Sequence, residues 1–225
     1  ATHQLRTPLA GIRWSLDMLI KKNFGEMNPE QVSVLEKGLV NTERMIRIVN
    51  DILNLDKIDN DQLKMAITPG DLNVVIEGAV TDLTQQAAIK EVRIEYRKSD
   101  ATLPSLPMDA DKIRMVMDNL IDNAVKYSKD GGVVHISVDA SKATSSSNPV
   151  VTVSVSDDGI GIPESDKEEM FTKFYRAPNA RRQDPNGNGI GLFVVKSIIE
   201  GHHGNIWYES KEGKGTSFHF SLPLR

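Results

Sequence analysis

Apolar residues in the first quarter of the chain recur at alternating intervals of four and three, the spacing that lines one face of a helix. The first such seam consists of Leu5, Leu9, Ile12, Leu16 and Leu19. The second consists of Val32, Leu35, Leu39, Thr42, Ile46, Val49 and Leu53. Between them, Gly25 is typical of a helix stop and Asn28–Pro29 of a helix start. The pattern predicts an antiparallel helical hairpin over residues 1–58.

A hairpin of this length cannot enclose a hydrophobic core by itself. Two such hairpins, one from each of two chains, would form a four-helix bundle that covers both seams. The length and regularity of the seams favour this homodimer through residues 1–58. Packing of the hairpin on the C-terminal part of its own chain is the alternative that the pattern leaves open.

The pattern changes after residue 58. Residues 59–70 are polar and contain Pro69–Gly70, which predicts a linker with a hinge. Beyond it, stretches with helical periodicity interleave with strands of alternating apolar and polar residues. We expect helices over 71–88, 109–128 and 189–202, and strands over 92–97, 133–140, 150–157, 204–210 and 216–224.

Strands joined by hairpins and interleaved with helices predict an α/β sandwich, with a mixed sheet and helices on one face. The Ser-rich sequence SKATSSSNP is expected to be the hairpin loop between two of these strands. The expected fold is therefore multidomain: an all-α hairpin, a linker, and an α/β sandwich domain over residues 71–225.

The bulk composition narrows the classes of function. The 225 residues carry a net charge of −4, which argues against a nucleic-acid-binding surface. The absence of cysteine excludes disulfides and thiolate metal sites and suits a reducing compartment. No apolar run approaches the roughly 18 residues of a membrane span. Because the chain begins without Met in a helical pattern, we expect a cytoplasmic fragment whose membrane contact lies only in missing upstream segments.

A polar face interrupts the helix predicted over 109–128. Asn119, Asn123 and Lys126 lie at positions i, i+4 and i+7, so they share one side of that helix. Asparagine is unfavourable inside a helix, so two of them on one face need an explanation. An amide oxygen is a hard ligand suited to Mg²⁺, and a lysine one turn further on can reach a phosphate. The alternative is a solvated face with two capping-type amides.

The strand predicted over 150–157 runs into DDGIGIP, in which Asp157 is followed by Gly159 and Gly161. Glycines permit a tight turn and a close approach of the backbone to a ligand. A carboxylate at the end of a strand can accept a hydrogen bond from an adenine amine and so discriminate against bases without this donor. A simple hairpin turn is the alternative, since Asp-Gly is a common turn signal.

Two further glycine-rich segments flank predicted elements. Gly187, Gly189 and Gly191 run directly into a helix whose N-terminal amides can face a phosphate. Their spacing differs from that of a Rossmann turn, and no P-loop is present. The other segment, which precedes the last strand and can back a nucleotide pocket, contains Gly213, Gly215 and Thr216.

The segment between the glycine turns combines aromatic residues with a polar stretch. Phe171, Phe174 and Tyr175 are expected to anchor it. The polar stretch that follows, marked by Gly and Pro, is expected to form a mobile lid over a nucleotide. Arg176 is a candidate for contact with a phosphate, and a solvated arginine is an equal alternative.

Taken in order, these segments resemble the motifs of the catalytic core of bacterial sensor histidine kinases of two-component systems. HQLRTPL is similar to the H box, NLIDNAVKYS to the N box and DDGIGIP to the first glycine box. FTKFYR resembles the F box, GNGIGL the second glycine box and GKGTSFHF the final glycine motif. The resemblance covers nearly the whole chain, and the motifs follow the family's order.

The resemblance implies a dimerisation and phosphotransfer hairpin followed by an ATP-binding domain of the gyrase, heat-shock and kinase ATPase type. His3 is then the phosphoacceptor, and Asp157 reads adenine. Asn123 holds Mg²⁺, with Asn119 helping. The residues implied to line the nucleotide and its lid are Lys126, Tyr127, Gly159, Gly161, Ile162, Phe174, Arg176, Gly187, Gly189, Gly191, Leu192 and Thr216. The implied activity is autophosphorylation from Mg-ATP and transfer to an aspartate on the receiver domain of a response regulator.

The residues beside His3 bear on its chemistry. His3 and Thr7 fall outside the apolar seam, on the solvent side of the helix, where a second domain can reach them. Pro8 removes a backbone N–H and invites a bend. The family commonly has an acidic residue after the histidine, whereas Gln4 cannot act as a general base, although it can orient the imidazole. The resemblance also gives Thr7 a role in dephosphorylating the partner, so a phosphatase activity is expected.

Two other functions stay open at this point. Gln4 favours a nucleotide-binding scaffold or a phosphatase-biased regulator with weak autokinase activity. An ATPase of the gyrase or mismatch-repair type is the other alternative. Those relatives carry a water-activating glutamate where Asn119 stands, so this asparagine speaks against hydrolysis.

Overall fold

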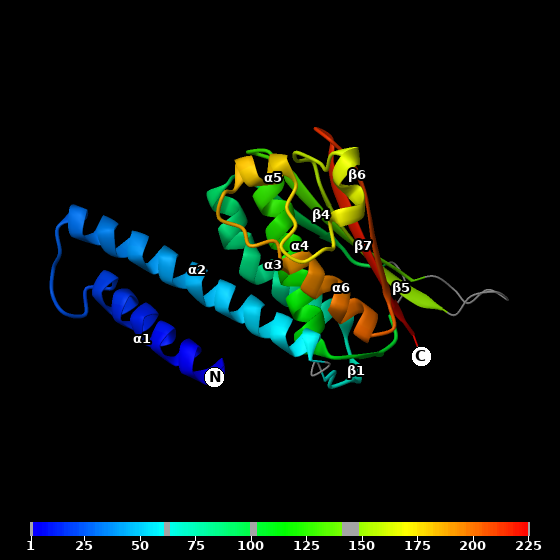
Figure 1. The fold of residues 1–225 in the computed structure, drawn as a ribbon, viewed down its shortest axis with the longest axis horizontal. Coiled ribbons are helices and arrows are strands. Elements are labelled where there is room, and N and C mark those ends of the chain that lie inside the picture. Colours follow the sequence, from blue (N-terminus) through cyan, green and yellow to red (C-terminus); the bar gives the residue numbers. More distant parts are fainter. Residues whose placement is uncertain (1, 61–63, 100–102, 141–148, 225) are drawn as a thin grey trace. The chain divides into compact units, whose positions relative to one another are not determined.

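The chain divides into two compact units, Ala1–Leu63 and Lys64–Arg225 (Figure 1). The computed structural model describes residues 2–60, 64–99, 103–140 and 149–224, and only the backbone of residues 2–6 and 59. Among the helices of these residues, none combines the length and apolar character needed to cross a membrane.

The N-terminal unit is the predicted helical hairpin of α1 (Thr2–Ile20) and α2 (Pro29–Asp59). The helix start predicted at Asn28–Pro29 is confirmed, because Asn28 Oδ1 accepts from Gln31 N at 2.8 Å and Gln31 Oε1 accepts from Asn28 N at 3.0 Å. The stop predicted at Gly25 is wrong, because α1 ends at Ile20 and Lys22 already takes a left-handed backbone with φ 60°.

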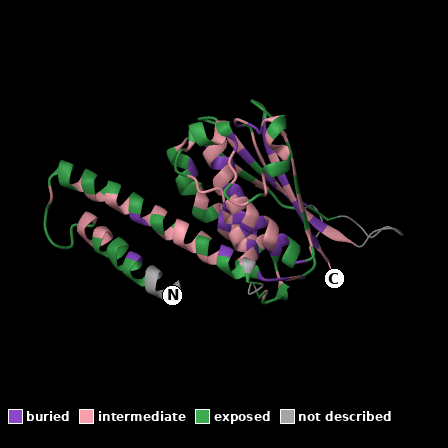
Figure 2. Cartoon of the chain, viewed as in Figure 1, coloured by how far each residue is buried: buried purple, intermediate pink, exposed green. Residues whose placement is uncertain are grey.

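The two helices of the hairpin touch along part of their length and leave many apolar side chains uncovered. Leu16 lies against Gly38, where an added Cβ would be 3.6 Å from Leu16 Cδ1. Leu9 and Thr42 are buried. In contrast, large apolar side chains of this unit remain exposed, among them Ile12, Trp14, Val34, Met45 and Ile52. Figure 2 shows that few positions along the two helices of the hairpin are buried. The hairpin alone therefore has little hydrophobic core.

The C-terminal unit contains a five-stranded mixed sheet in the order β2-β4-β5-β7-β6. Its strands are β2 (Arg93–Arg97), β4 (Val133–Ala140), β5 (Val150–Asp157), β6 (Asn205–Lys211) and β7 (Gly215–Pro223). β2 and β4 run parallel, and all other neighbours are antiparallel. All five strands predicted from alternation are confirmed, and residues 141–148 of the expected hairpin loop lie outside the described residues.

Helices α3 (Leu72–Ile89), α4 (Ala110–Tyr127) and α6 (Gly191–Gly201) cover one face of this sheet (Figure 1). The inward residues of β5, Val151, Val153 and Val155, are fully buried, which is the period of two that a strand requires. α4 turns a continuous apolar face toward the core, made of Ile113, Val116, Met117, Leu120, Ile121, Ala124 and Val125. The predicted α/β sandwich is confirmed.

Four short elements were not predicted from the sequence. They are β1 (Thr68–Gly70), β3 (Leu106–Met108), the 3₁₀ helix η1 (Glu164–Glu169) and α5 (Pro178–Gln183). β1 pairs antiparallel with β3, so the hinge predicted at Pro69–Gly70 is instead part of a strand. A side chain at Gly70 would lie 2.8 Å from Met108 Cε, and this close packing holds the segment in place.

A buried histidine joins the end of α6 to the start of α4. His202 Nε2 accepts a hydrogen bond from the backbone N–H of Asp109 at 2.9 Å, and its Nδ1 lies 2.8 Å from the Ile198 carbonyl oxygen. Asp109 itself caps α4, because its Oδ1 accepts from Lys112 N at 3.1 Å. These contacts fix α4 and α6 relative to each other within this unit.

Candidate functional site

The C-terminal end of α4 lies directly against the turn that follows β5. Ile160 N donates to the Tyr127 carbonyl at 3.2 Å. A Cβ at Gly159 would stand 1.9 Å from that same carbonyl oxygen, so only glycine permits this approach. The helix with the paired asparagines and the strand that ends in Asp157 therefore meet at one edge of the sheet.

Asp157 presents a half-buried carboxylate at the end of β5. Burial raises the pKa of the Asp157 carboxyl to about 6, although backbone hydrogen bonds from Gly159 and Thr216 oppose the rise. Its Oδ1 accepts from Gly159 N at 2.9 Å, and Asp157 pairs in register with Thr216 of β7. A carboxylate this poorly hydrated is a strong acceptor for a ligand donor that can replace water.

Ser210 connects the first glycine turn to the final glycine motif. Its Oγ accepts from Ile162 N at 2.8 Å, donates to the Gly215 carbonyl at 2.9 Å and lies 2.9 Å from Thr216 Oγ1. Gly161 has φ 64°, and a Cβ there would be 2.1 Å from the Lys211 carbonyl oxygen. Ser210 was missed because one serine in a strand carries no sequence signal of such a junction.

The polar face of α4 borders the start of α6. Asn119 Nδ2 donates to the Met115 carbonyl at 2.8 Å, and its Oδ1 would lie 2.7 Å from a Cβ at Gly191. Leu192 follows Gly191 in the first turn of α6 and is half-buried. Asn123, one turn beyond Asn119, is half-buried and its amide has no hydrogen-bond partner within the part of the chain described here.

The segment between the glycine turns is anchored only in part as predicted. Phe171 packs edge-on against Tyr208 and Phe218, with ring centroids 5.8 and 6.4 Å apart. The Tyr175 hydroxyl donates to Asp166 Oδ1 at 2.5 Å. Phe174 was also predicted to be an anchor, and this is wrong.

Phe174 faces solvent because of its backbone. The residue is 62% exposed and has a left-handed φ of 63°. Its N–H donates to the Gly189 carbonyl at 2.9 Å, and a Cβ at Gly189, where φ is 70°, would be 2.7 Å from the Phe174 carbonyl carbon. This tight backbone pairing joins the F box to the second glycine box.

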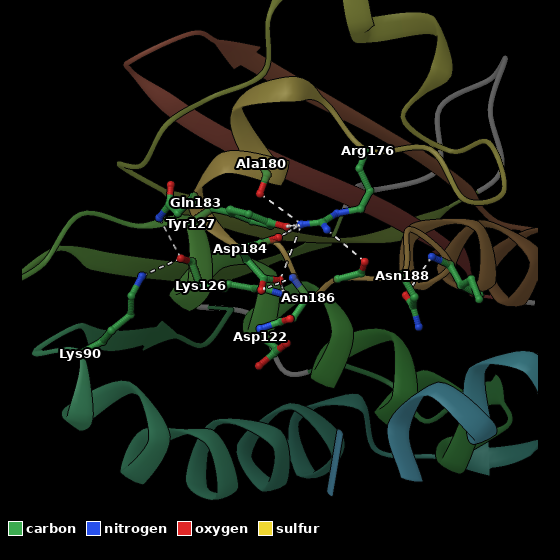
Figure 3. Close-up of polar contacts among 12 residues, drawn as sticks. Lys90, Asp122, Lys126, Tyr127, Arg176, Ala180, Gln183, Asp184, Asn186 and Asn188 are labelled. Carbon is green, nitrogen blue, oxygen red and sulfur yellow. Dashed lines mark hydrogen bonds and ion pairs between the residues drawn. The ribbon is translucent and has the colours of Figure 1, made fainter. Parts of the chain in front are cut away.

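Arg176 organises the polar stretch that follows (Figure 3). Its Nη1 donates to the Gly187 carbonyl at 3.0 Å, and its Nη2 donates to the Ala180 carbonyl at 3.1 Å and to the Asp184 carbonyl. A Cβ at Gly187 would be 2.7 Å from Arg176 Cζ. The alternative of a solvated arginine is wrong, because only 10% of the side chain is exposed.

Two cations of the site converge on Asp184, the residue that directly follows α5 (Figure 3). Lys126 Nζ forms an ion pair with Asp184 Oδ2, and Arg176 Nη2 lies 3.6 Å from the same oxygen. Lys126 and Arg176 are the two cations that the sequence motifs singled out for phosphate. Asp184 itself was not predicted, since its partners lie on other elements.

Two other residues of the lid, the polar stretch that follows Arg176, donate hydrogen bonds to backbone carbonyl oxygens that border the site. Asn179 Nδ2 donates to the Gly161 carbonyl at 2.9 Å, and Gln183 Nε2 donates to the Lys126 carbonyl at 3.0 Å. Lys90 Nζ donates to that same Lys126 carbonyl at 2.6 Å, at the C-terminal end of α4 (Figure 3). The lid thus rests on both the first glycine turn and α4.

The predicted catalytic residues of the hairpin lie on α1, in the other unit. His3 and Gln4 belong to the helix, but their side chains lie outside the described residues. Thr7 is exposed, as predicted, and α1 continues through Pro8.

The donor set at the site fits a hard cation held largely by a nucleotide. Within the residues that the structure describes, no group of three or more His, Cys, Asp and Glu side chains could hold a metal ion. Mg²⁺ commonly takes few protein ligands and is completed by substrate phosphates and water. The unengaged amide of Asn123 is suited to such a role.

Both units match the models of known protein families. The family described as "Histidine kinase-, DNA gyrase B-, and HSP90-like ATPase" matches residues 108–225. The "His Kinase A (phospho-acceptor) domain" matches residues 1–61.

Individual relatives are similar over the whole chain. Sensor histidine kinase WalK of Bacillus subtilis (strain 168) is 35% identical over 230 residues, covering 100% of this chain and 36% of that protein. The solved structure of the Acinetobacter baumannii histidine kinase AdeS has a TM-score of 0.66 at 25% identity and covers 99% of this chain and 98% of that one. Full-length ShkA, solved in complex with AMPPNP, shares the fold with a TM-score of 0.76 at 24% identity, over 99% of this chain and 44% of that one.

The chain spans about a third of the length of the WalK relative. One family match covers more than half of the chain and the other covers the hairpin. The chain therefore belongs to the histidine kinase-, DNA gyrase B- and HSP90-like ATPase family, as a two-component histidine kinase catalytic core.

Proposed function

We propose that this core binds Mg-ATP in the C-terminal unit, phosphorylates His3 and passes the phosphoryl group to an aspartate of a response regulator. The observation that carries the proposal is that α4 contacts two glycine turns at once. Its Tyr127 carbonyl meets the turn that follows Asp157, and its Asn119 meets Gly191 at the start of α6. This arrangement offers a base-reading acceptor, hard oxygen ligands and cations within one site.

The adenine end is assigned to Asp157. A carboxylate shielded from water accepts a hydrogen bond from an exocyclic amine and rejects a base that presents an oxygen there, because the acceptor would then be unpaired. Gly159 and Gly161 let the turn after Asp157 pack directly against the carbonyls of Tyr127 and Lys211, which supports a fixed position for this carboxylate. Adenine rather than guanine is the expected base.

The phosphate end is assigned to Lys126 and Arg176, with Asn123 as the protein ligand of Mg²⁺. When bound, Mg²⁺ neutralises charge on the phosphates during transfer. The start of α6, which follows the glycines of the second glycine box, offers backbone N–H groups for the same phosphates. The residues of the chain then act mainly by binding and orienting the nucleotide.

Phosphoryl transfer requires a nucleophile that can reach the terminal phosphate. A neutral His3 nitrogen forms the new N–P bond, the bond from the γ-phosphorus to its bridging oxygen breaks, and ADP leaves. Gln4 can orient the ring but does not accept its proton. The side-chain amide of Asn119 likewise cannot activate a water, which favours transfer to the histidine over hydrolysis.

The hairpin is assigned to dimerisation. Val34, Met45 and Ile52 of α2 are separated by 11 and 7 residues, so they share one side of the helix, and all three are more than half exposed in the single chain. A second hairpin would bury this stripe and complete a four-helix bundle. A role of Thr7 in dephosphorylation of the regulator is part of the proposal, and its exposure on α1 supports it.

Labelling with γ-labelled ATP tests the proposal. The parent chain is expected to gain an acid-labile, base-stable label that His3→Ala abolishes. His135→Ala is the matched control, because His135 is an exposed histidine of β4, and this variant is expected to label like the parent. Equal labelling of His3→Ala and the parent would contradict the assignment.

A nucleotide-binding scaffold or phosphatase-biased regulator is the second candidate, and Gln4 is the observation that favours it. This candidate predicts that ATP binds tightly while little label reaches the protein. Titrating ATP affinity beside phosphohistidine yield on the same preparation separates the two functions.

A further inference from the structure

The two cations assigned to phosphate are already engaged by a carboxylate of the chain. Asp184 Oδ2 pairs with Lys126 Nζ and lies 3.6 Å from Arg176 Nη2. The side chains of Asp184 and Arg176 are 17% and 10% exposed, and that of Lys126 is 32% exposed. The pairs are thus largely shielded from solvent, where electrostatic attraction is stronger than at an open surface.

The position of this carboxylate is fixed by its backbone. Asp184 N donates to the Ala180 carbonyl at 3.0 Å, and Arg176 Nη2 donates to the Asp184 carbonyl oxygen. Asp184 Oδ1 accepts from Asn186 N at 3.0 Å, which leaves Oδ2 directed at the cations (Figure 3). The lid therefore presents an anion to its own phosphate ligands.

The carboxylate is charged in this setting. Burial alone would raise the pKa of the Asp184 carboxyl, but the hydrogen bonds and charges of Lys126, Asn186 and Arg176 lower it below its ordinary value. A carboxylate and a phosphate offer these cations the same kind of oxygen anion.

We infer that Asp184 is a tethered competitor of the nucleotide phosphates, which must displace its carboxylate from Lys126 and Arg176 before they can bind. The inference rests on the proposed nucleotide site and adds a residue that sets its affinity. A group fixed on the same chain acts at a high effective concentration, so displacing it lowers the affinity for any phosphate ligand. A nucleoside without phosphates meets no such competition.

The same contact links the lid to α4, because Asp184 directly follows α5 and Lys126 belongs to α4. Phosphates that take over Lys126 release the side-chain carboxylate of Asp184 from α4. The Gln183–Lys126 carbonyl bond does not use the cation and can persist.

Asp184→Asn is the direct test, because it keeps the shape of the side chain and removes its charge. Calorimetric titration of the full chain with Mg²⁺ and ATP is expected to show about tenfold tighter binding than the parent, the scale of a shielded ion pair. Adenosine is expected to bind both proteins equally, within about twofold. Asp184→Ser, a second neutral variant, is expected to show the same gain in ATP affinity and the same unchanged adenosine affinity.

Asp139→Asn is the matched control. It makes the same change in net charge. Asp139 is an exposed residue near the C-terminal end of β4, whereas the other end of this strand pairs with Ser156. ATP affinity is expected to be unchanged. In Lys126→Ala, which removes one contested cation, the further substitution Asp184→Asn is expected to strengthen ATP binding less than it does in the parent.

The outcomes separate the inference from the function on which it rests. Weaker or unchanged ATP binding by the neutral variants would overturn the inference and leave Asp184 as a support of the lid. An equal gain for ATP and adenosine would overturn it as well, because competition acts only on phosphates. A parent chain that binds no ATP would refute the proposed function itself.

Discussion

At the scale of single residues, the Asp157 carboxyl sets how the site responds to pH. Its pKa is raised to about 6, mainly by burial, from an ordinary value of 3.8. Because the folded value lies above the unfolded one, this group destabilises the fold as pH rises from about 4 to about 6. For the proposed adenine site the dependence of binding is opposite, since the adenine amine is expected to donate to the ionised carboxylate.

Adenosine affinity is therefore expected to fall about tenfold between pH 7 and pH 5, as Asp157 becomes protonated through about 6. Adenosine is the suitable ligand because it carries no phosphate that titrates in this range. Asp157→Asn is expected to bind more weakly at every pH and to lose this dependence. A variant whose affinity declines as steeply as that of the parent would assign the titration to another group.

The site residues found from the sequence belong to local patterns, whereas those missed are defined by contacts between distant parts of the chain. Asn119, Asn123 and Lys126 stand out because their types are unusual on one face of a strong helix, a local pattern. Asp184 contacts Lys126 across 58 positions, and Ser210 binds Ile162 across 48, and nothing in the local sequence marks either contact. Local patterns revealed the face of the site, and only the fold reveals which groups meet it.

At the scale of elements, the junction between the first glycine turn and the β6–β7 hairpin depends on close backbone packing. Gly161 and Gly213 both have positive φ, of 64° and 73°. A Cβ at Gly161 would lie 2.1 Å from the Lys211 carbonyl oxygen, whereas nothing lies within 4 Å of one at Gly213. A substitution at either glycine would therefore strain the backbone, but only at Gly161 would the new Cβ also clash with another part of the chain.

Gly213→Ala is expected to lower the free energy of unfolding by about 1 kcal/mol, the cost of a left-handed alanine. Gly161→Ala is expected to lower it by about 3 kcal/mol or more, because the backbone must also move. Urea denaturation, followed through the unfolding transition of the C-terminal unit, measures both losses in the free energy of unfolding. Equal losses would mean that the junction yields easily and does not hold the turn.

Long elements were predicted well, and short ones were not. The strands of the main sheet and helices α3, α4 and α6 each carry enough residues to display a period of two or 3.6. β1 and β3 have three residues each and α5 has six, too few for a period, and they form through pairing and lid contacts. The lid was expected as a polar loop, and the helical turn within it is what orients Asp184.

At the scale of the whole molecule, the hairpin carries more apolar surface than its two helices cover. Met45 and Ile52 are 54% and 51% exposed on one side of α2. The substitutions Met45→Glu and Ile52→Glu, made together, are expected to convert a dimer to a monomer, because charge would be buried in the bundle. Sedimentation velocity at micromolar concentration measures the change.

Arg47→Glu is the control for that pair. It changes the net charge by the same amount, and Arg47 is an exposed residue on the opposite side of α2. This variant is expected to stay dimeric. A monomeric parent chain, or a dimer unaffected by the two glutamates, would contradict dimerisation through this stripe.

The proposed activity requires one site for Mg-ATP where α4, the turn after β5 and the lid come together. A crystal structure of the chain with Mg²⁺ and a non-hydrolysable ATP analogue tests this most directly. We expect the adenine amine within hydrogen-bond distance of Asp157, the metal bound by Asn123, and Lys126 on phosphate instead of Asp184. A nucleotide bound elsewhere, or one whose base does not contact Asp157, would contradict the account.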